Sequence, residues 1–172
     1  WEKIETHFNV TAAHKNEHLY YNRDKNHFSP ARKFIDWSVN YDVTLRPMKN
    51  GELNIYYYGS TSRPSLVSLL PLTDTSNEMV VSVNNPNLKT EWDNSINMHG
   101  NWFNEKRGDN YSMFGYFSWR KNAATSISQT DETTGKQMLT TKNVNGNYHT
   151  FLHMSTEQPL DTARHWTLRL SA

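Results

Sequence analysis

The feature that most constrains this chain is an unbroken alternation of apolar and polar residues over positions 35–45, IDWSVNYDVTL. Successive side chains of a β-strand point to opposite faces, so this segment would carry one apolar and one polar face. The apolar positions are Ile35, Trp37, Val39, Tyr41, Val43 and Leu45. The pattern predicts a strand that packs its apolar face on a core and turns its polar face to water.

This strand is predicted to form a hairpin with the segment that follows it. Asn50-Gly51 favours a two-residue type I′ turn, because both residues adopt positive φ more readily than most. Beyond the turn, LNIYYY (53–58) again alternates, with Leu53, Ile55 and Tyr57 on one face. Residues 35–58 therefore read as one hairpin.

Shorter strand candidates occur along the rest of the chain, at 4–10, 78–83, 111–121, 136–143, 148–154 and 165–170, and of these 78–83 is apolar on both faces. Asn145-Gly146 is predicted to join the segments 136–143 and 148–154 as a second hairpin. In the last segment, Trp166, Leu168 and Leu170 are predicted to be buried.

Together these segments predict an all-β fold, an antiparallel β-sandwich or jelly roll of about nine strands. The helical signal is limited to Ser29-Pro30, which suits a helix start and predicts at most a short helical turn near residues 29–34. No internal repeat or linker interrupts the chain. We therefore expect residues 1–172 to form a single β-sandwich domain.

Composition argues against several classes of function. Eighteen Lys and Arg against 17 Asp and Glu give a net charge of +1, whereas nucleic-acid binders usually carry a strongly basic face. The absence of cysteine rules out disulfides, thiolate metal sites and cysteine nucleophiles. No apolar run approaches the ~18 residues of a transmembrane helix, and WEKIETHF is not a signal peptide. Phosphate-loop and dinucleotide motifs are absent, so no cofactor is expected.

Two residue pairs have a spacing that could serve a chemical site. His149 and His153 could chelate a metal on a helix, but on a strand they would lie about 13 Å apart, so no metal site is expected. Glu91 and Asp93 have a spacing compatible with a glycosidase pair, but their polar neighbours indicate a solvated turn rather than the burial that raises a catalytic pKa. Both interpretations favour a non-enzymatic protein.

The stretch 100–121, GNWFNEKRGDNYSMFGYFSWRK, is rich in aromatic residues and is predicted to be a hairpin that turns around Gly108. By alternation, its odd positions form a core face, which consists of Tyr111, Met113, Phe117 and Trp119. The even positions Phe114, Tyr116 and Arg120 then lie on the opposite face. They either form a second buried face or, with Trp92 and Trp102, a ligand-binding platform suited to sugar rings.

Four hypotheses of function follow, of which the last is an enzyme of the jelly-roll type with Glu91 and Asp93 as its candidate residues. The first is a non-catalytic, secreted or surface binding module that contacts carbohydrate or another protein surface. The second is a structural assembly subunit, such as a virus-type jelly-roll coat domain, which would form homo-oligomers on the virion surface. The third is a toxin-like β-sandwich that binds membranes through exposed Trp and Tyr. Residues 123–141 are not expected to be its membrane-inserting hairpin, because neither face of that segment is apolar enough.

Overall fold

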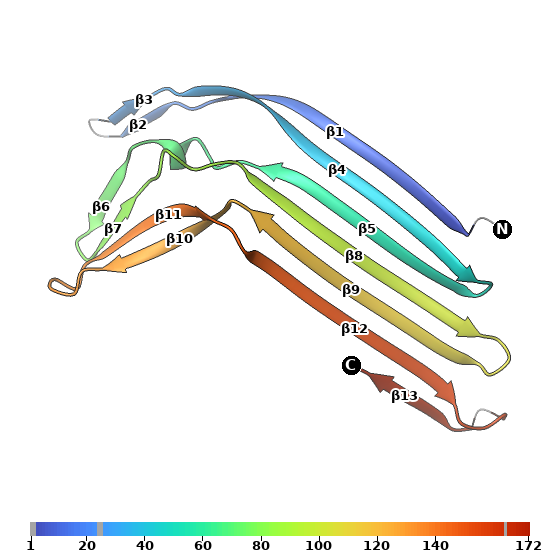
Figure 1. Cartoon of the computed structure of the whole chain (residues 1–172). Coiled ribbons are helices and arrows are strands. Elements are labelled where there is room, and N and C mark those ends of the chain that lie inside the picture. The colour runs from blue at the N-terminus through green and yellow to red at the C-terminus, as the bar shows by residue number, and fades with distance from the viewer. Residues whose placement is uncertain (1–2, 24–25, 164) are drawn as a thin grey trace.

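The computed structural model describes residues 3–23, 26–163 and 165–172, and these are mostly β-strand (Figure 1). Its largest unit is a seven-stranded sheet, called here the large sheet, in which every strand is antiparallel to its neighbours. In spatial order its strands are β1 (Ile4–His18), β4 (Ala31–Met48), β5 (Gly51–Ser62), β8 (Glu91–Asn104), β9 (Asp109–Lys121), β12 (Asn147–Pro159) and β13 (Thr167–Ser171).

Two smaller sheets lie at one end of the large sheet (Figure 1). The four-stranded sheet, called here the small sheet, has the spatial order β10 (Ala123–Thr130), β11 (Gln137–Val144), β7 (Val80–Val83) and β6 (Thr73–Asn77). The third sheet is the hairpin of β2 (Tyr21–Arg23) and β3 (Asn26–Phe28), and a single 3-10 turn, η1 (Val67–Leu69), precedes β6. In Figure 1 the long strands run side by side as one curved layer, and the small sheet continues beyond their ends.

The all-β class and the predominance of antiparallel sheets are confirmed, although the described residues form more strands than the nine expected. The sheets are not closed. The short helical turn considered near residues 29–34 does not form, because β4 already begins at Ala31. No helix in the described part of the chain has the length and hydropathy needed to cross a bilayer.

The predicted hairpin at 35–58 is confirmed as β4 and β5, which pair along most of their length. Its turn lies one residue earlier than expected. Met48 pairs with Gly51, so the two turn residues are Lys49 and Asn50 rather than Asn50 and Gly51.

The second predicted hairpin is wrong. β11 pairs with β10 and β7 in the small sheet, whereas β12 pairs with β9 and β13 in the large sheet. Asn145 and Gly146, whose φ is 87°, therefore form a corner between two sheets. A turn signal marks where the chain changes direction, but the strand pairing depends on which distant edges are available.

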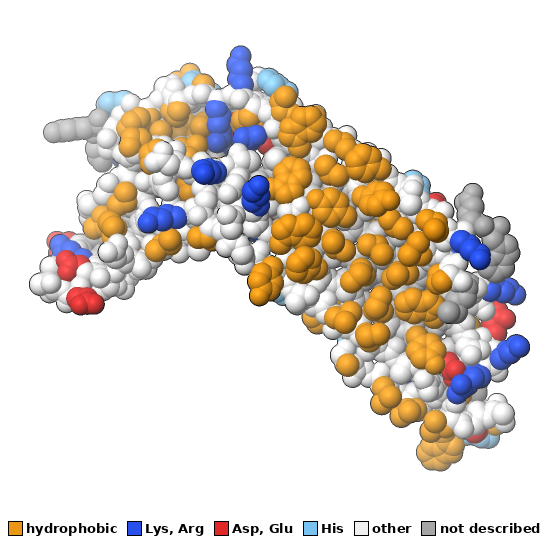
Figure 2. Space-filling model, in the orientation of Figure 1, with side chains coloured by type: hydrophobic (Ala, Val, Ile, Leu, Met, Phe, Trp, Pro, Cys, Tyr) orange, Lys and Arg blue, Asp and Glu red, His pale blue; other side chains and the backbone are white. Residues whose placement is uncertain are grey.

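The predicted burial of the apolar faces is also wrong. Trp37 is 46% exposed and Tyr41 is 42% exposed, and on β9 both Tyr111 and Phe117 are exposed while Met113 and Trp119 are half-buried. Near the C-terminus, the residues expected to be buried are exposed, namely Trp166, Leu168 and Leu170. Figure 2 shows hydrophobic side chains uncovered over the long strands. Since the large sheet is a single layer, alternation sorts its side chains onto two faces without providing a layer to cover the apolar one.

Candidate functional site

The large sheet carries an apolar face that continues across its strands in register. Its middle row, which runs through the centre of the sheet, consists of Val43, Ile55, Met98, Gly115 and Leu152, each directly opposite the next on the neighbouring strand. Because the strands are paired without offset along this row, the alternation of five separate segments adds up to one surface. This surface is the orange area over the long strands in Figure 2.

Aromatic side chains mark the end of the apolar face nearest the small sheet. We call this group the proximal row, and it consists of Trp37, Trp92, Trp119 and Tyr148, from β4, β8, β9 and β12. Trp119 lies directly opposite Tyr148, and Trp92 lies two residue pairs further toward the small sheet. Trp119 also stacks on Phe117, which lies on the same face of β9, with ring centroids 5.3 Å apart.

A buried asparagine fixes the proximal row. Asn94 is 6% exposed although it lies among apolar residues. Its Oδ1 accepts hydrogen bonds from Trp92 Nε1 at 2.6 Å and from the Tyr57 hydroxyl at 2.9 Å. Its amide donates to the carbonyl oxygens of Trp92 and Trp119 at 3.3 and 3.4 Å. The polar ends of two aromatic side chains are thus satisfied inside an apolar surface, where an unpaired donor would be costly.

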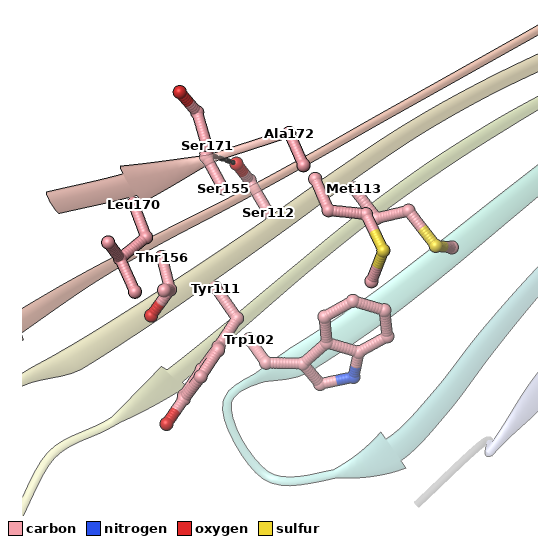
Figure 3. A pocket seen from close by; sticks show the side chains of 10 residues that line it. Trp102, Tyr111, Ser112, Met113, Ser155, Thr156, Leu170, Ser171 and Ala172 are labelled. Carbon is pink, nitrogen blue, oxygen red and sulfur yellow. Dashed lines mark hydrogen bonds between the residues drawn. The ribbon is translucent and has the colours of Figure 1, made fainter.

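The opposite end of the apolar face carries a distal row, which consists of Trp102 on β8 and Tyr111 on β9, paired directly. Trp102 lies across Gly100, because a Cβ built on that glycine would come within 2.5 Å of the Trp102 ring. Both aromatic side chains line an apolar hollow of about 310 Å³ together with Met113 and Leu170. Figure 3 shows these four side chains. The two aromatic rows therefore bracket the apolar face along the strand direction.

The structure divides the five predicted ligand-binding residues between the two faces of the large sheet. Phe114, Tyr116 and Arg120 lie on the polar face of β9, as alternation predicted, whereas Trp92 and Trp102 lie on the apolar face near its two ends. The five residues therefore do not form one platform.

Phe114 and Tyr116 are only partly covered by neighbouring side chains. Phe114 is 41% exposed, with its ring 6.0 Å from that of Phe151, and Tyr116 is half-buried, 5.6 Å from the His149 ring. Both thus have an aromatic neighbour on β12, but Phe114 keeps a ring surface accessible to solvent.

Arg120 occupies a polar hollow of about 270 Å³ on this face, lined also by Tyr58, Asp93, Tyr116 and Asn147. Its guanidinium forms an ion pair with Asp93, and its Nε lies 3.9 Å from Glu91 Oε2. The expectation that Glu91 and Asp93 occupy a solvated turn is wrong, because both belong to β8 and are half-buried. The arrangement offers two carboxylates, one guanidinium and aromatic rings to a polar ligand.

The histidine pair lies on a strand, as predicted. His149 and His153 are four residues apart on β12, opposite Ser118 and Phe114. Within residues 3–23, 26–163 and 165–172, no group of three or more His, Cys, Asp or Glu side chains is placed to hold a metal ion.

The sequence reasoning missed the aromatic rows and the contribution of Tyr58 and Asn147 to the polar hollow. A signal for the rows was present, since Trp92 and Trp102 are ten positions apart and Tyr111 and Trp119 eight. No comparable signal existed for the hollow, because its residues come from β5, β8, β9 and β12 and meet only through strand register.

Two comparisons with known proteins bear on this surface. The nucleoporin POM152 of Saccharomyces cerevisiae is 28% identical to the chain over 110 residues, which cover 57% of this chain and 8% of POM152. The chain thus spans less than a tenth of that relative, and the likeness carries no activity over. The model of the outer membrane protein beta-barrel family matches residues 6–172, nearly the full length. The chain belongs to the outer membrane protein beta-barrel family.

Proposed function

We propose that the large sheet is part of the wall of a membrane-spanning β-barrel, with its apolar face against lipid and its polar face toward the barrel interior. The observation that carries this proposal is the exposed apolar face, continuous across β1, β4, β5, β8, β9 and β12 and bracketed by aromatic rows. In water such a surface would be a strong aggregation hazard, whereas in a bilayer it needs no covering layer.

The dimensions of the apolar face support this proposal. The ten residue steps from Trp92 to Trp102 correspond to about 33 Å along the strand, at about 3.3 Å per residue. A strand tilted by about 45° would then cross about 23 Å of membrane, close to the ~25 Å apolar band of such proteins. Trp and Tyr at both ends match the aromatic girdles that lie at the two lipid–water interfaces.

The sheet edges set a requirement for this function. The outer edges of β1 and β13, and the outer edge of β12 before Met154, have no paired strand among the described residues. In hydrocarbon, each unpaired backbone N–H and C=O group costs several kcal/mol, so only a closed sheet is stable there. Seven strands are fewer than the eight of small barrels, so further strands, from the same protein or from a second copy, complete the wall in this proposal.

The connections between the strands indicate which end of the large sheet faces the outside of the cell. On the small-sheet side the large strands are joined by long excursions that contain β2, β3, β6, β7, β10 and β11, whereas on the other side β4–β5 and β8–β9 are joined by short turns. Barrels of this class have long extracellular loops and short periplasmic turns. The small sheet is therefore assigned to the extracellular side.

Site-directed labelling tests the proposal, and the absence of cysteine makes the chain suitable for it. Nitroxide labels would be placed at Val39→Cys, Tyr41→Cys and Val43→Cys and, on the other face, at Asn40→Cys, Asp42→Cys and Thr44→Cys in the full-length protein in lipid vesicles. The first group is expected to be accessible to oxygen dissolved in lipid, and the second to a water-soluble nickel chelate. Equal accessibility of both groups to the chelate would refute the proposal.

A second function rests on the polar hollow around Arg120. We propose that this hollow binds carbohydrate, since Tyr58 and Tyr116 offer ring surfaces to the apolar faces of sugars while Asp93, Arg120 and Asn147 can bond hydroxyl groups. This proposal keeps the ligand class predicted from the sequence but restricts it to the polar face, without Trp92 and Trp102.

Affinity electrophoresis against a panel of neutral oligosaccharides tests this second function. Binding is expected for the wild-type protein and is expected to be lost in Tyr116→Ala and Arg120→Ala, whereas Trp102→Phe is expected to bind normally. Absence of binding to every oligosaccharide, or equal binding by all variants, would rule the hollow out as a sugar site.

A further inference from the structure

Three lysines surround the junction between the large and the small sheet. Lys89 precedes β8, Lys121 ends β9 and Lys142 lies near the end of β11. All three are exposed, and none forms an ion pair with another described residue. Figure 2 shows Lys and Arg side chains gathered at this junction, on the same face of the molecule as the hydrophobic surface.

One asparagine holds the backbones of the three lysines together. Asn143, which directly follows Lys142, accepts a hydrogen bond from the Lys89 N–H at 2.7 Å and donates to the Lys89 carbonyl at 3.3 Å. It also donates to the carbonyl of Asn122, the residue after Lys121, at 2.7 Å. The lysines thus converge through a network of hydrogen bonds and are not scattered on independent loops.

The junction is adjacent to the proximal row. Lys121 lies directly opposite Trp92 in the register of β8 and β9, and it follows Trp119 on the same face. The acidic residues closest in sequence, Glu91 and Asp93, lie on the polar face beside Arg120 and do not neutralise these lysines. Positive charge is therefore uncompensated immediately beyond the aromatic border of the apolar face.

We propose that Lys89, Lys121 and Lys142 form a binding site for the phosphate headgroups of anionic membrane lipids. This inference rests on the proposed membrane function, since a lipid whose chains cover the apolar face has its headgroup at the level of the proximal row. Lysine suits this position, because its alkyl stem lies along apolar surface while its ammonium group reaches the polar interface. Basic residues at such an interface attract anionic lipids, and each strengthens binding by about fivefold.

Tryptophan quenching by brominated lipids tests the site in the full-length protein. One reporter would keep Trp92 and another Trp102, with the remaining tryptophans replaced by phenylalanine. Each would be reconstituted with brominated phosphatidylglycerol or brominated phosphatidylcholine in otherwise identical vesicles. Trp92 is expected to be quenched more strongly by the anionic lipid than by phosphatidylcholine. Trp102, at the other end of the apolar face, is expected to be quenched equally by both lipids. The preference at Trp92 should weaken as salt screens the charges.

Charge-neutralised variants then identify the lysines responsible. Lys89→Gln, Lys121→Gln and Lys142→Gln together are expected to abolish the preference at Trp92, a loss on the order of 100-fold in relative affinity. The matched control removes three other exposed lysines, as Lys49→Gln, Lys106→Gln and Lys136→Gln, and is expected to keep it. Spin-labelled phosphatidylglycerol provides a second readout in a protein that retains all its tryptophans.

The outcomes separate this inference from the proposed function. If neither brominated lipid quenches Trp92 or Trp102, the membrane function itself is wrong. If both tryptophans are quenched but Trp92 shows no anionic preference, or keeps it in the triple lysine variant, the headgroup site is refuted while the membrane function stands.

Discussion

The large and the small sheet differ in what they do with apolar side chains. In the large sheet, apolar residues such as Trp37, Phe117 and Leu152 are exposed. The buried hydrophobic residues among those described, Leu70 and Ala123, both belong to the end region, Leu70 after η1 and Ala123 at the start of β10. Among the described residues, full burial of a hydrophobic side chain is thus confined to this end region.

The difference shows that the burial of apolar side chains depends on strand length and on a second layer that covers them, as much as on the residue pattern. β4 has 18 residues and β5 has 12, whereas β7 has 4 and β10 has 8. A strand needs about 9–11 residues to cross a bilayer. The long strands satisfy this requirement and the small-sheet strands do not. Residues 123–141 comprise β10, the turn that follows it and most of β11.

A charge placed at the centre of the apolar face tests this comparison most severely. Leu152 lies in the middle row, and in the proposed membrane orientation Leu152→Arg is expected to lower the free energy of unfolding in vesicles by about 2–4 kcal/mol, because the arginine would lie near the bilayer centre and leave water. Ser128→Arg, on exposed β10, is expected to change it by less than about 0.5 kcal/mol. Urea titration followed by tryptophan fluorescence measures both. Equal costs at the two positions would remove the distinction between the sheets.

The buried asparagine offers a second test within the large sheet. Asn94→Ala leaves the Trp92 and Tyr57 donors without their acceptor and is expected to destabilise the protein by about 1–3 kcal/mol. The emission maximum of Trp92 should shift as its indole is released. Asn97→Ala, on the polar face of the same strand, serves as the control and should leave that emission unchanged. If Asn94→Ala changed neither the stability nor the Trp92 emission, the proximal row would not depend on this residue.

Gly100 sharpens the comparison between the two aromatic rows. Gly100→Ala is expected to cost about 1 kcal/mol, because the new Cβ would press into the Trp102 ring and force it to move. Quenching of Trp102 by brominated lipid should change, while quenching of Trp92 should not. If neither tryptophan responds, the packing of Trp102 across Gly100 does not position the distal row.

The smallest effect is expected from acid acting on the turn of the small sheet between β10 and β11. Backbone N–H groups of Thr133 and Thr134 donate to Asp131 Oδ1 in the turn between β10 and β11, and the bond from Thr133 contributes most to lowering the pKa of Asp131 from its ordinary 3.8. A lowered pKa in the folded state means that the turn is stabilised above the ordinary pKa and loses this stabilisation as pH falls through the folded-state value.

Amide hydrogen exchange, corrected for its intrinsic pH dependence, measures this effect. Exchange in residues 131–137 is expected to accelerate between pH 6 and pH 2 while exchange in β8 stays constant, and Asp131→Asn should remove the difference. Acceleration in the large sheet instead of the turn would contradict the assignment.

Sequence reasoning succeeded where the evidence was local. The alternation of residues 35–45 predicted β4 and its two faces, and the parity of residues 111–121 placed Phe114, Tyr116 and Arg120 together on one face. It failed for the pairing of β11 and β12 and for the candidate site. The neighbours of Arg120 on β5 and β12, Tyr58 and Asn147, are far from it in the sequence and meet it only through strand register.

By itself, the sequence determined that the chain forms strands and that Ile35, Trp37 and Val39 share one face, because the two-residue period of a strand is a local property of the backbone. Only the tertiary structure decided whether that face is covered. A core requires a second layer brought in by distant contacts, and here the long strands pair edge to edge into a single sheet. The pairing that aligned five apolar segments into one surface also left that surface exposed, because edge-to-edge hydrogen bonding extends a sheet without covering it.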